Sequence, residues 1–116
     1  MKFEEVFSIV GSVPFISEEN GRFLYDLILK ERLTNILELG IAHGTATCYM
    51  AAAVQEIGEG SVTAVDLIEV KHKYEPSAES QLAKTGLSEF ATVNRMQTGY
   101  TWFLHDEKDQ VPQKVR

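Results

Sequence analysis

Residues 35–53, NILELGIAHGTATCYMAAA, contain the pattern that decides the fold of this chain. An apolar run over 36–39 meets Gly40, Gly44 follows after three residues, and an amphipathic pattern then begins. This order predicts a buried strand, a tight glycine turn and a helix. Such a turn brings backbone N–H groups and a helix N-terminus to one point, where a ligand can approach the backbone closely. An ordinary strand-to-helix connection that binds nothing has the same spacing, because short glycine motifs are common.

The residues that follow complete a strand–helix–strand unit. Apolar residues recur at helical spacing over about 45–57, and the small residues 51–53 would let this helix lie close to a sheet. Residues 61–66, SVTAVD, are mostly apolar or β-branched and predict a second strand that ends with Asp66. Two strands joined by one helix in this span require a parallel, right-handed crossover.

Two helices are expected before this unit. The apolar spacing over 3–10 predicts a short helix that stops at Gly11. Ser17 is typical of an N-cap, and the two acidic residues after it suit the first turn of a helix that runs to about Arg32. The residues at helical spacing on the apolar face of this second helix are Phe23, Leu24, Leu27 and Ile28.

A helix and a weaker strand are expected after the unit. The helix would begin near Pro76 and end at Gly86, where a C-cap belongs. Residues 90–96 predict the third strand, and residues 100–104 predict a helical turn. The polar residues 105–116 are expected to be exposed.

Composition restricts the possible partners. The chain has 116 residues, enough for one domain, and its net charge of −6 argues against a nucleic-acid backbone as partner. No apolar run reaches membrane-spanning length, and the acidic start of the chain is unlike a secretory signal. Cys48 is the single cysteine, which excludes an intrachain disulfide and fits a reducing compartment. We therefore expect a cytoplasmic protein with neither a membrane nor a nucleic acid as partner.

Residues 38–44, ELGIAHG, resemble the first motif, E-x-G-x-x-x-G, of class I S-adenosylmethionine-dependent methyltransferases. The resemblance is closest to the small-molecule O-methyltransferase-like branch. An acidic residue, Asp66, ends the second strand at the distance that this family has. Residues 14–21 are similar to the family's lead-in to the helix before strand one, and residues 82–87 are similar to its third crossover. The resemblance covers about residues 13–104.

The resemblance implies an α/β, Rossmann-like methyltransferase fold, truncated here to about three parallel strands with flanking helices. It divides the chain into N-terminal helices (1–33), a β-α-β-α-β core (34–104) and a polar tail (105–116). The family's sheet continues beyond the third strand, so the chain would be the cofactor-binding half without the acceptor and catalytic half. Strand one would then be an apolar edge, which favours pairing with a second copy or with the remainder of a longer chain.

The implied cofactor is S-adenosyl-L-methionine, and no metal site is expected. Gly40 and Gly44 would let the backbone approach the methionine part, because glycine has no side chain. Glu38 would lie near the methionine amino group, and Asp66 would accept both ribose hydroxyls. The positions that the resemblance assigns to cofactor binding are Glu38, Gly40, Ile41, Ala42, Gly44, Thr45, Asp66, Leu67, Gln97 and Thr98.

Alternatives stay open at three of these places. Asp66 could be a solvated strand end, and Glu38 could be a buried acid that caps local backbone N–H groups. Residues 96–99, MQTG, differ from the family's G-D/S-A-like sequence, which leaves the adenine contact of Gln97 and Thr98 open.

The leading hypothesis is a methyltransferase domain that acts on a small-molecule acceptor. A noncatalytic Rossmann-like binding or assembly module is the alternative. An NAD enzyme is less well supported, because the turn lacks G-x-G-x-x-G.

Overall fold

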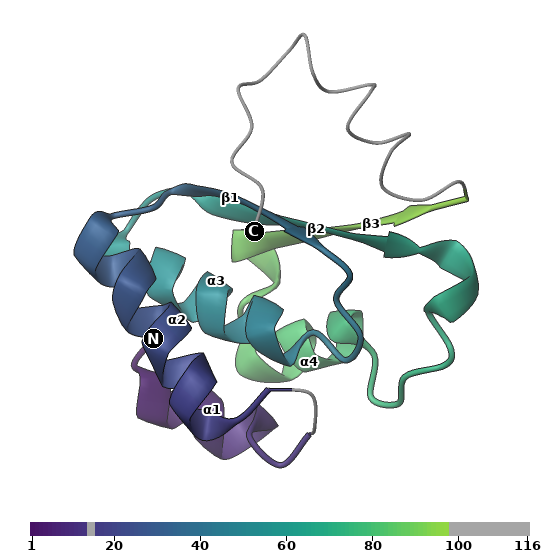
Figure 1. The fold of residues 1–116 in the computed structure, drawn as a ribbon, viewed down its shortest axis with the longest axis horizontal. Coiled ribbons are helices and arrows are strands. Elements are labelled where there is room, and N and C mark those ends of the chain that lie inside the picture. Colours follow the sequence, from purple (N-terminus) through teal and green to yellow (C-terminus); the bar gives the residue numbers. More distant parts are fainter. Residues whose placement is uncertain (14–15, 98–116) are drawn as a thin grey trace, which may run out of the picture.

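The computed structural model describes residues 1–13 and 16–97. Helices and strands alternate after two N-terminal helices (Figure 1). The elements are α1 (Phe3–Val10), α2 (Glu18–Glu31), β1 (Asn35–Leu39), α3 (Thr45–Ile57), β2 (Ser61–Leu67), α4 (Ala78–Thr85) and β3 (Ala91–Met96), with short 3-10 turns η1 (Ile68–Val70) and η2 (Ser88–Phe90).

The strands of the described residues form one parallel sheet in the order β1-β2-β3. Leu37 pairs with Thr63 of β2, and Thr63 pairs with Thr92 of β3. β2 is central and β1 lies at an edge of the described sheet. The predicted α/β fold with parallel strands is therefore confirmed.

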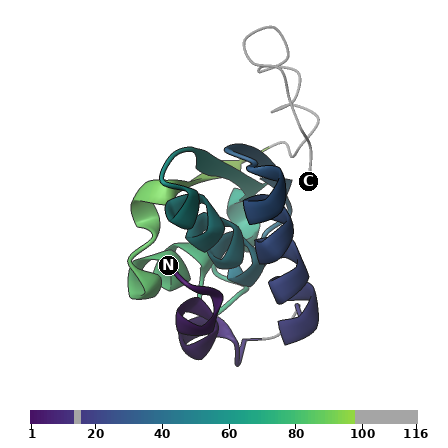
Figure 2. The ribbon, with the colours of Figure 1, turned by 90° about the vertical axis from the view of Figure 1, so that its left-hand side faces the viewer.

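The helices of the described residues lie on one side of this sheet (Figure 1). α3 packs against β2, and α2 lies beside α3 (Figure 2). Residues 51–53 of α3 are alanines without exposed surface, and their small side chains let the helix approach its neighbours closely. The core thus forms around α3, with Tyr49, Val54 and Ile36 among its fully or almost fully buried side chains.

Most of the predicted helix ends are confirmed. The hydroxyl of Ser17 accepts a hydrogen bond from the Asn20 N–H at 3.1 Å, which makes it the N-cap of α2. Gly58 and Gly86 follow α3 and α4 in the left-handed conformation expected of helix C-caps. α4 begins at Ala78 instead of near Pro76, because Ser77 caps it by accepting the Ser80 N–H.

The predicted apolar face of α2 is partly wrong. Phe23 is 67% exposed, whereas Gly21, Tyr25 and Ile28 are the buried residues of this helix. The reason is the packing of Gly21 against the ring of Tyr49, where a Cβ on Gly21 would lie 2.5 Å from Cε2. That close contact turns the Gly21 face inward and leaves Phe23 outside.

Two expectations lie outside the described residues: the helical turn over 100–104 and the exposed tail over 105–116. The division of the chain into three segments therefore stays a prediction. Among residues 1–13 and 16–97, no helix has the length and apolarity needed to cross a bilayer.

Candidate functional site

The glycine turn over 40–44 connects β1 to α3 at the carboxyl end of the sheet. Gly40 and Gly44 have φ angles of 81° and 76°, in the left-handed region that glycine adopts readily. The Gly40 N–H donates to the carbonyl of Val65 at 2.8 Å, and the Gly44 N–H donates to the carbonyl of Ile41 at 2.7 Å. The first of these bonds holds the turn beside the end of β2, and the second closes the turn itself.

A cavity of about 120 Å³ lies at this turn. It brings together the end of β1, the turn itself, the first residues of α3 and one residue that precedes α2. Its lining residues are Ile16, Glu38, Gly40, Ile41, Ala42, His43, Thr45 and Ala46. Five of the ten predicted cofactor-binding residues therefore line one cavity: Glu38, Gly40, Ile41, Ala42 and Thr45.

Glu38 is a buried acid that connects β1 to α3. Its side chain is 8% exposed, and its Oε1 accepts a hydrogen bond from the Thr47 hydroxyl at 2.5 Å. Burial raises the pKa of Glu38 to about 7; the Thr47 hydrogen bond opposes this rise and the nearby charge of Asp66 adds to it. The alternative role for Glu38 supposed that its carboxyl caps local backbone N–H groups. In the structure the described hydrogen bond to this carboxyl comes from the Thr47 hydroxyl instead.

Asp66 is buried against the glycine turn. Its Oδ2 accepts the N–H of Ile41 at 3.0 Å and that of Ala42 at 3.4 Å, and its Oδ1 accepts the N–H of Leu67 at 2.8 Å. With 6% exposure it is not a solvated strand end, so that alternative is wrong. Asp66 is not among the residues that line the cavity, although two of its hydrogen-bond donors are.

The start of α3 faces the same cavity through Thr45 and Ala46. The first N–H groups of a helix have no intrahelical acceptor and carry the positive end of its dipole. The Thr45 hydroxyl accepts a hydrogen bond from Nε2 of Gln81 at 3.3 Å. Gln81, from α4, is 1% exposed; sequence reasoning missed it because its partner lies far away in the chain.

His43 and Ile16 line the cavity without having been predicted as cofactor-binding residues. Nδ1 of His43 lies 2.7 Å from the carbonyl oxygen of Pro76, and because a carbonyl only accepts, Nδ1 carries the proton. The His43 ring also meets the Tyr74 ring edge-on, with centroids 5.2 Å apart. The position of His43 inside the glycine turn is the one sequence feature that could have indicated it as a residue of this cavity.

Of the remaining predicted residues, Leu67 is the last residue of β2 and Gln97 directly follows β3. Leu67 pairs with Met96, so these two strand ends are neighbours, and Gln97 follows as an exposed residue. Thr98 lies outside the described residues. Over 1–13 and 16–97, no group of three or more His, Cys, Asp or Glu side chains is arranged to hold a metal ion.

The sequence model of a family described as "methyltransferase domain" matches residues 37–112, which is more than half of the chain. The chain belongs to this methyltransferase family. The match begins in β1 and includes the glycine turn, α3, β2, α4 and β3, whereas α1, α2 and the cavity residue Ile16 precede it.

Solved methyltransferase structures share the fold. The O-methyltransferase from Bacillus cereus in complex with SAH has a TM-score of 0.70 and 21% identity, and the match covers 98% of this chain and 53% of that one. TomG from Streptomyces achromogenes, an O-methyltransferase of tomaymycin synthesis in complex with SAM, has a TM-score of 0.68 and 18% identity over 97% of this chain and 51% of its own. A putative O-methyltransferase from Klebsiella pneumoniae has a TM-score of 0.71 and 17% identity over 97% and 50% of the two chains.

This methyltransferase domain therefore spans about half the length of the structures that it matches. No curated protein matches the sequence significantly.

Proposed function

We propose that this methyltransferase domain binds S-adenosylmethionine at the glycine turn, as the cofactor-binding half of an enzyme that methylates a small molecule. The observation that carries the proposal is the cavity in which Glu38, the turn residues and the N-terminus of α3 meet. The two matched structures with SAM and SAH support the choice of cofactor.

The polar groups that line this cavity fit the methionine part of the cofactor. The carboxylate of that part would lie at the first N–H groups of α3, beside Thr45 and Ala46, where the helix dipole favours negative charge. Its ammonium group would lie at the carboxyl of Glu38. An ammonium there favours the ionised form of Glu38, whose pKa is otherwise raised by burial.

The rest of the cofactor would extend past the cavity towards the ends of β2 and β3. Sites for drug-sized ligands have volumes of about 300–1,000 Å³, so a cavity of about 120 Å³ suits only one part of the molecule. Asp66 and Leu67 would face the ribose and the adenine, with Gln97 and Thr98 beyond them. Because Asp66 already accepts backbone N–H groups, a ribose contact requires its carboxylate to share these bonds.

Bound S-adenosylmethionine supplies an electrophilic methyl group on its sulfonium. The contribution of the residues in this chain is to bind and orient the cofactor, and positioning of this kind accelerates group transfer. The small-molecule acceptor would meet the methyl group outside the residues assigned here.

The edge strand β1 would pair with a second copy of the chain or with the remainder of a longer one. A cytoplasmic location fits the free, buried thiol of Cys48.

A noncatalytic binding or assembly module is the second candidate. The hydrogen bonds that join the turn to Val65 and Asp66 suit this candidate, because they hold the turn whether or not a ligand binds. Such a module would keep the glycine turn as scaffold. A methyl-transfer assay with a panel of small hydroxyl-bearing acceptors separates the two candidates, since the module gives no turnover even when the cofactor binds.

Calorimetric titration of the 116-residue chain with S-adenosylhomocysteine tests the cofactor, with NAD as the matched negative ligand. We expect binding of the first and not of the second. Glu38→Gln should weaken the binding, because the ammonium loses an ionised partner. Glu89→Gln, at an exposed position in η2, is the control and should bind like the parent chain. Binding of NAD alone would remove the proposal.

A further inference from the structure

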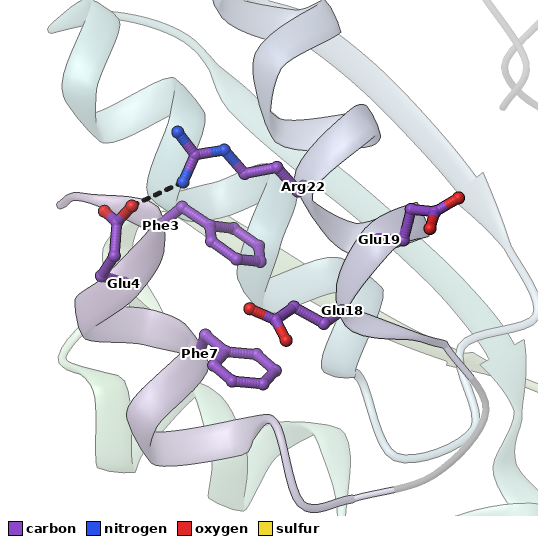
Figure 3. A pocket seen from close by; sticks show the side chains of 6 residues that line it. All are labelled: Phe3, Glu4, Phe7, Glu18, Glu19 and Arg22. Carbon is purple, nitrogen blue, oxygen red and sulfur yellow. Dashed lines mark hydrogen bonds and ion pairs between the residues drawn. The ribbon is translucent and has the colours of Figure 1, made fainter.

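A second, larger cavity lies between α1 and α2. Its volume is about 330 Å³, within the range of small-ligand sites, and Figure 3 shows its lining. The lining residues are Phe3, Glu4, Phe7, Glu18, Glu19 and Arg22. None of them lines the cavity at the glycine turn, so the two are separate.

Aromatic rings form one wall of this second cavity. The rings of Phe3 and Phe7 are stacked with centroids 5.7 Å apart and planes 17° from parallel. The Phe7 ring also lies against Gly11, where a Cβ would be 2.4 Å from its Cε1, so the ring is held in place. The guanidinium of Arg22 lies 5.2 Å from the centroid of the Phe3 ring. The wall therefore already holds one cation of the protein itself over an aromatic face.

Among the charged side chains of the lining, Glu18 offers a carboxylate that faces the rings and has no ion pair with the described residues. Arg22 pairs with Glu4 at 2.6 Å and with Asp26 at 3.3 Å, so its charge is compensated. Within the part of the chain that the structure describes, Glu18 and Glu19 form no ion pair. The carboxylate of Glu18 extends towards the two rings, whereas that of Glu19 points away from them (Figure 3).

We propose that this cavity binds a small organic cation with an ammonium head group. The head group lies between the Glu18 carboxylate and the face of Phe7, where an ion pair and a cation–π contact act together. Glu18 and Glu19 also stabilise the N-terminus of α2 through its dipole. Stabilisation of the helix dipole requires only the two acids and no aromatic rings. The rings of Phe3 and Phe7 beside Glu18 therefore favour an organic cation over a metal ion as the ligand.

This site is independent of the function proposed above, because it uses neither the glycine turn nor Asp66. The ion pair with Glu18 and the cation–π contact with Phe7 are both weak at exposed sites, so we expect a dissociation constant in the millimolar range. Removal of either contact should weaken binding by about two- to five-fold, which corresponds to the usual strength of a cation–π contact near the surface.

Titration of the isotope-labelled 116-residue chain with tetramethylammonium chloride, followed by NMR, tests the proposal. Amide shifts are expected around residues 3–7 and 18–22, and sodium chloride at equal ionic strength should not reproduce them. Glu18→Gln and Phe7→Leu should each weaken binding, and Glu19→Gln, whose carboxylate points away from the rings, is the matched control.

Three results overturn the proposal: no shifts at these residues, the same shifts with sodium chloride, or equal affinity of the Glu18→Gln and Glu19→Gln chains. Thermal unfolding of each variant checks that it is folded. If Phe7→Leu does not fold, the comparison of Glu18→Gln with Glu19→Gln decides, because both are conservative changes in the first turn of α2.

Discussion

Oδ2 of Asp66 accepts a hydrogen bond from the backbone N–H of Ile41 at 3.0 Å. This contact joins the end of β2 to the glycine turn that follows β1, and the bond from Ala42 to the same oxygen strengthens the connection. Removal of the carboxylate leaves N–H groups without an acceptor in a buried place, which costs about 1–3 kcal/mol for each fully buried group. Asp66 therefore shapes the candidate site whether or not it touches a ligand.

We expect Asp66→Ala to lower the free energy of unfolding by about 2–3 kcal/mol, because the turn loses its acceptor. Asp66→Asn keeps one oxygen that can accept the Ile41 and Ala42 N–H groups, but its NH2 group then faces the Leu67 N–H, so it should cost about 1–2 kcal/mol. Urea unfolding followed by circular dichroism measures both values. An Asp66→Ala chain as stable as the parent would contradict the role of Asp66 in holding the turn.

The two Asp66 variants also separate turn-holding from ribose binding. If Asp66 accepts the ribose hydroxyls, Asp66→Asn weakens S-adenosylhomocysteine binding although the turn stays in place. If Asp66→Asn binds S-adenosylhomocysteine like the parent chain, the ribose role is lost and only the turn-holding role remains. Calorimetric titration of the folded variants makes this comparison.

Gly44 and Gly86 form a matched pair of glycines. Their φ angles are 76° and 74°, but a Cβ on Gly44 would lie 2.5 Å from the Cβ of Ala78, whereas a Cβ on Gly86 would meet nothing within 4 Å. Gly86→Ala should therefore cost only the backbone strain, about 1 kcal/mol. Gly44→Ala should cost about 1–3 kcal/mol more, because α4 must move away from the turn. Chemical denaturation of the two variants measures the difference. Equal losses of unfolding free energy in both variants would show that the start of α4 moves away from the turn at no cost.

The buried carboxyl of Glu38 should make stability depend on pH. Its pKa is about 7 in the folded chain against an ordinary value of 4.5, so the folded state keeps a proton that the unfolded state releases. The stabilising contribution is complete below pH 4.5 and is lost as the pH rises through about 7. A rise from 4.5 to about 7 corresponds to roughly 3 kcal/mol over this window.

Denaturant unfolding between pH 4.5 and 8 tests this prediction by comparison of the parent chain with Glu38→Gln. The glutamine retains an oxygen that can accept the Thr47 hydroxyl and does not titrate, so the variant should lack this part of the pH dependence. The histidines are present in both chains, and their effects cancel in the difference. A difference that stays constant over the window would show that Glu38 titrates normally.

The edge position of β1 predicts association of the isolated chain. β1 pairs with β2 on one side, and the described residues contain no strand on its other side. The unpaired backbone N–H and C=O groups of an edge strand can pair with another chain, and a charged side chain on the edge hinders this. We expect light scattering of the purified chain to show dimers or larger species, and Leu39→Lys to reduce them. A stable, well-folded monomer at high concentration would count against association through β1.

The local elements of this fold could be predicted from the sequence. The spacing of Gly40 and Gly44 predicted the strand–turn–helix, and Ser17 and Gly86 predicted helix ends that the structure has. These signals depend on residues that are neighbours in the chain, since a glycine in a turn or a hydroxyl at an N-cap acts on backbone groups a few positions away. The family resemblance also followed from such a short motif.

The tertiary structure alone decided which side chains face one another. Gly21 is buried and Phe23 is exposed because of the Tyr49 ring, which lies on another helix. The hydrogen bond from Ile41 to Asp66 and that from Gln81 to Thr45 likewise join residues 25 and 36 positions apart. Periodicity reports only which residues share a face of one element. The rotation of that element and the partners of its polar groups are determined by packing against elements distant in sequence, and no local pattern records them.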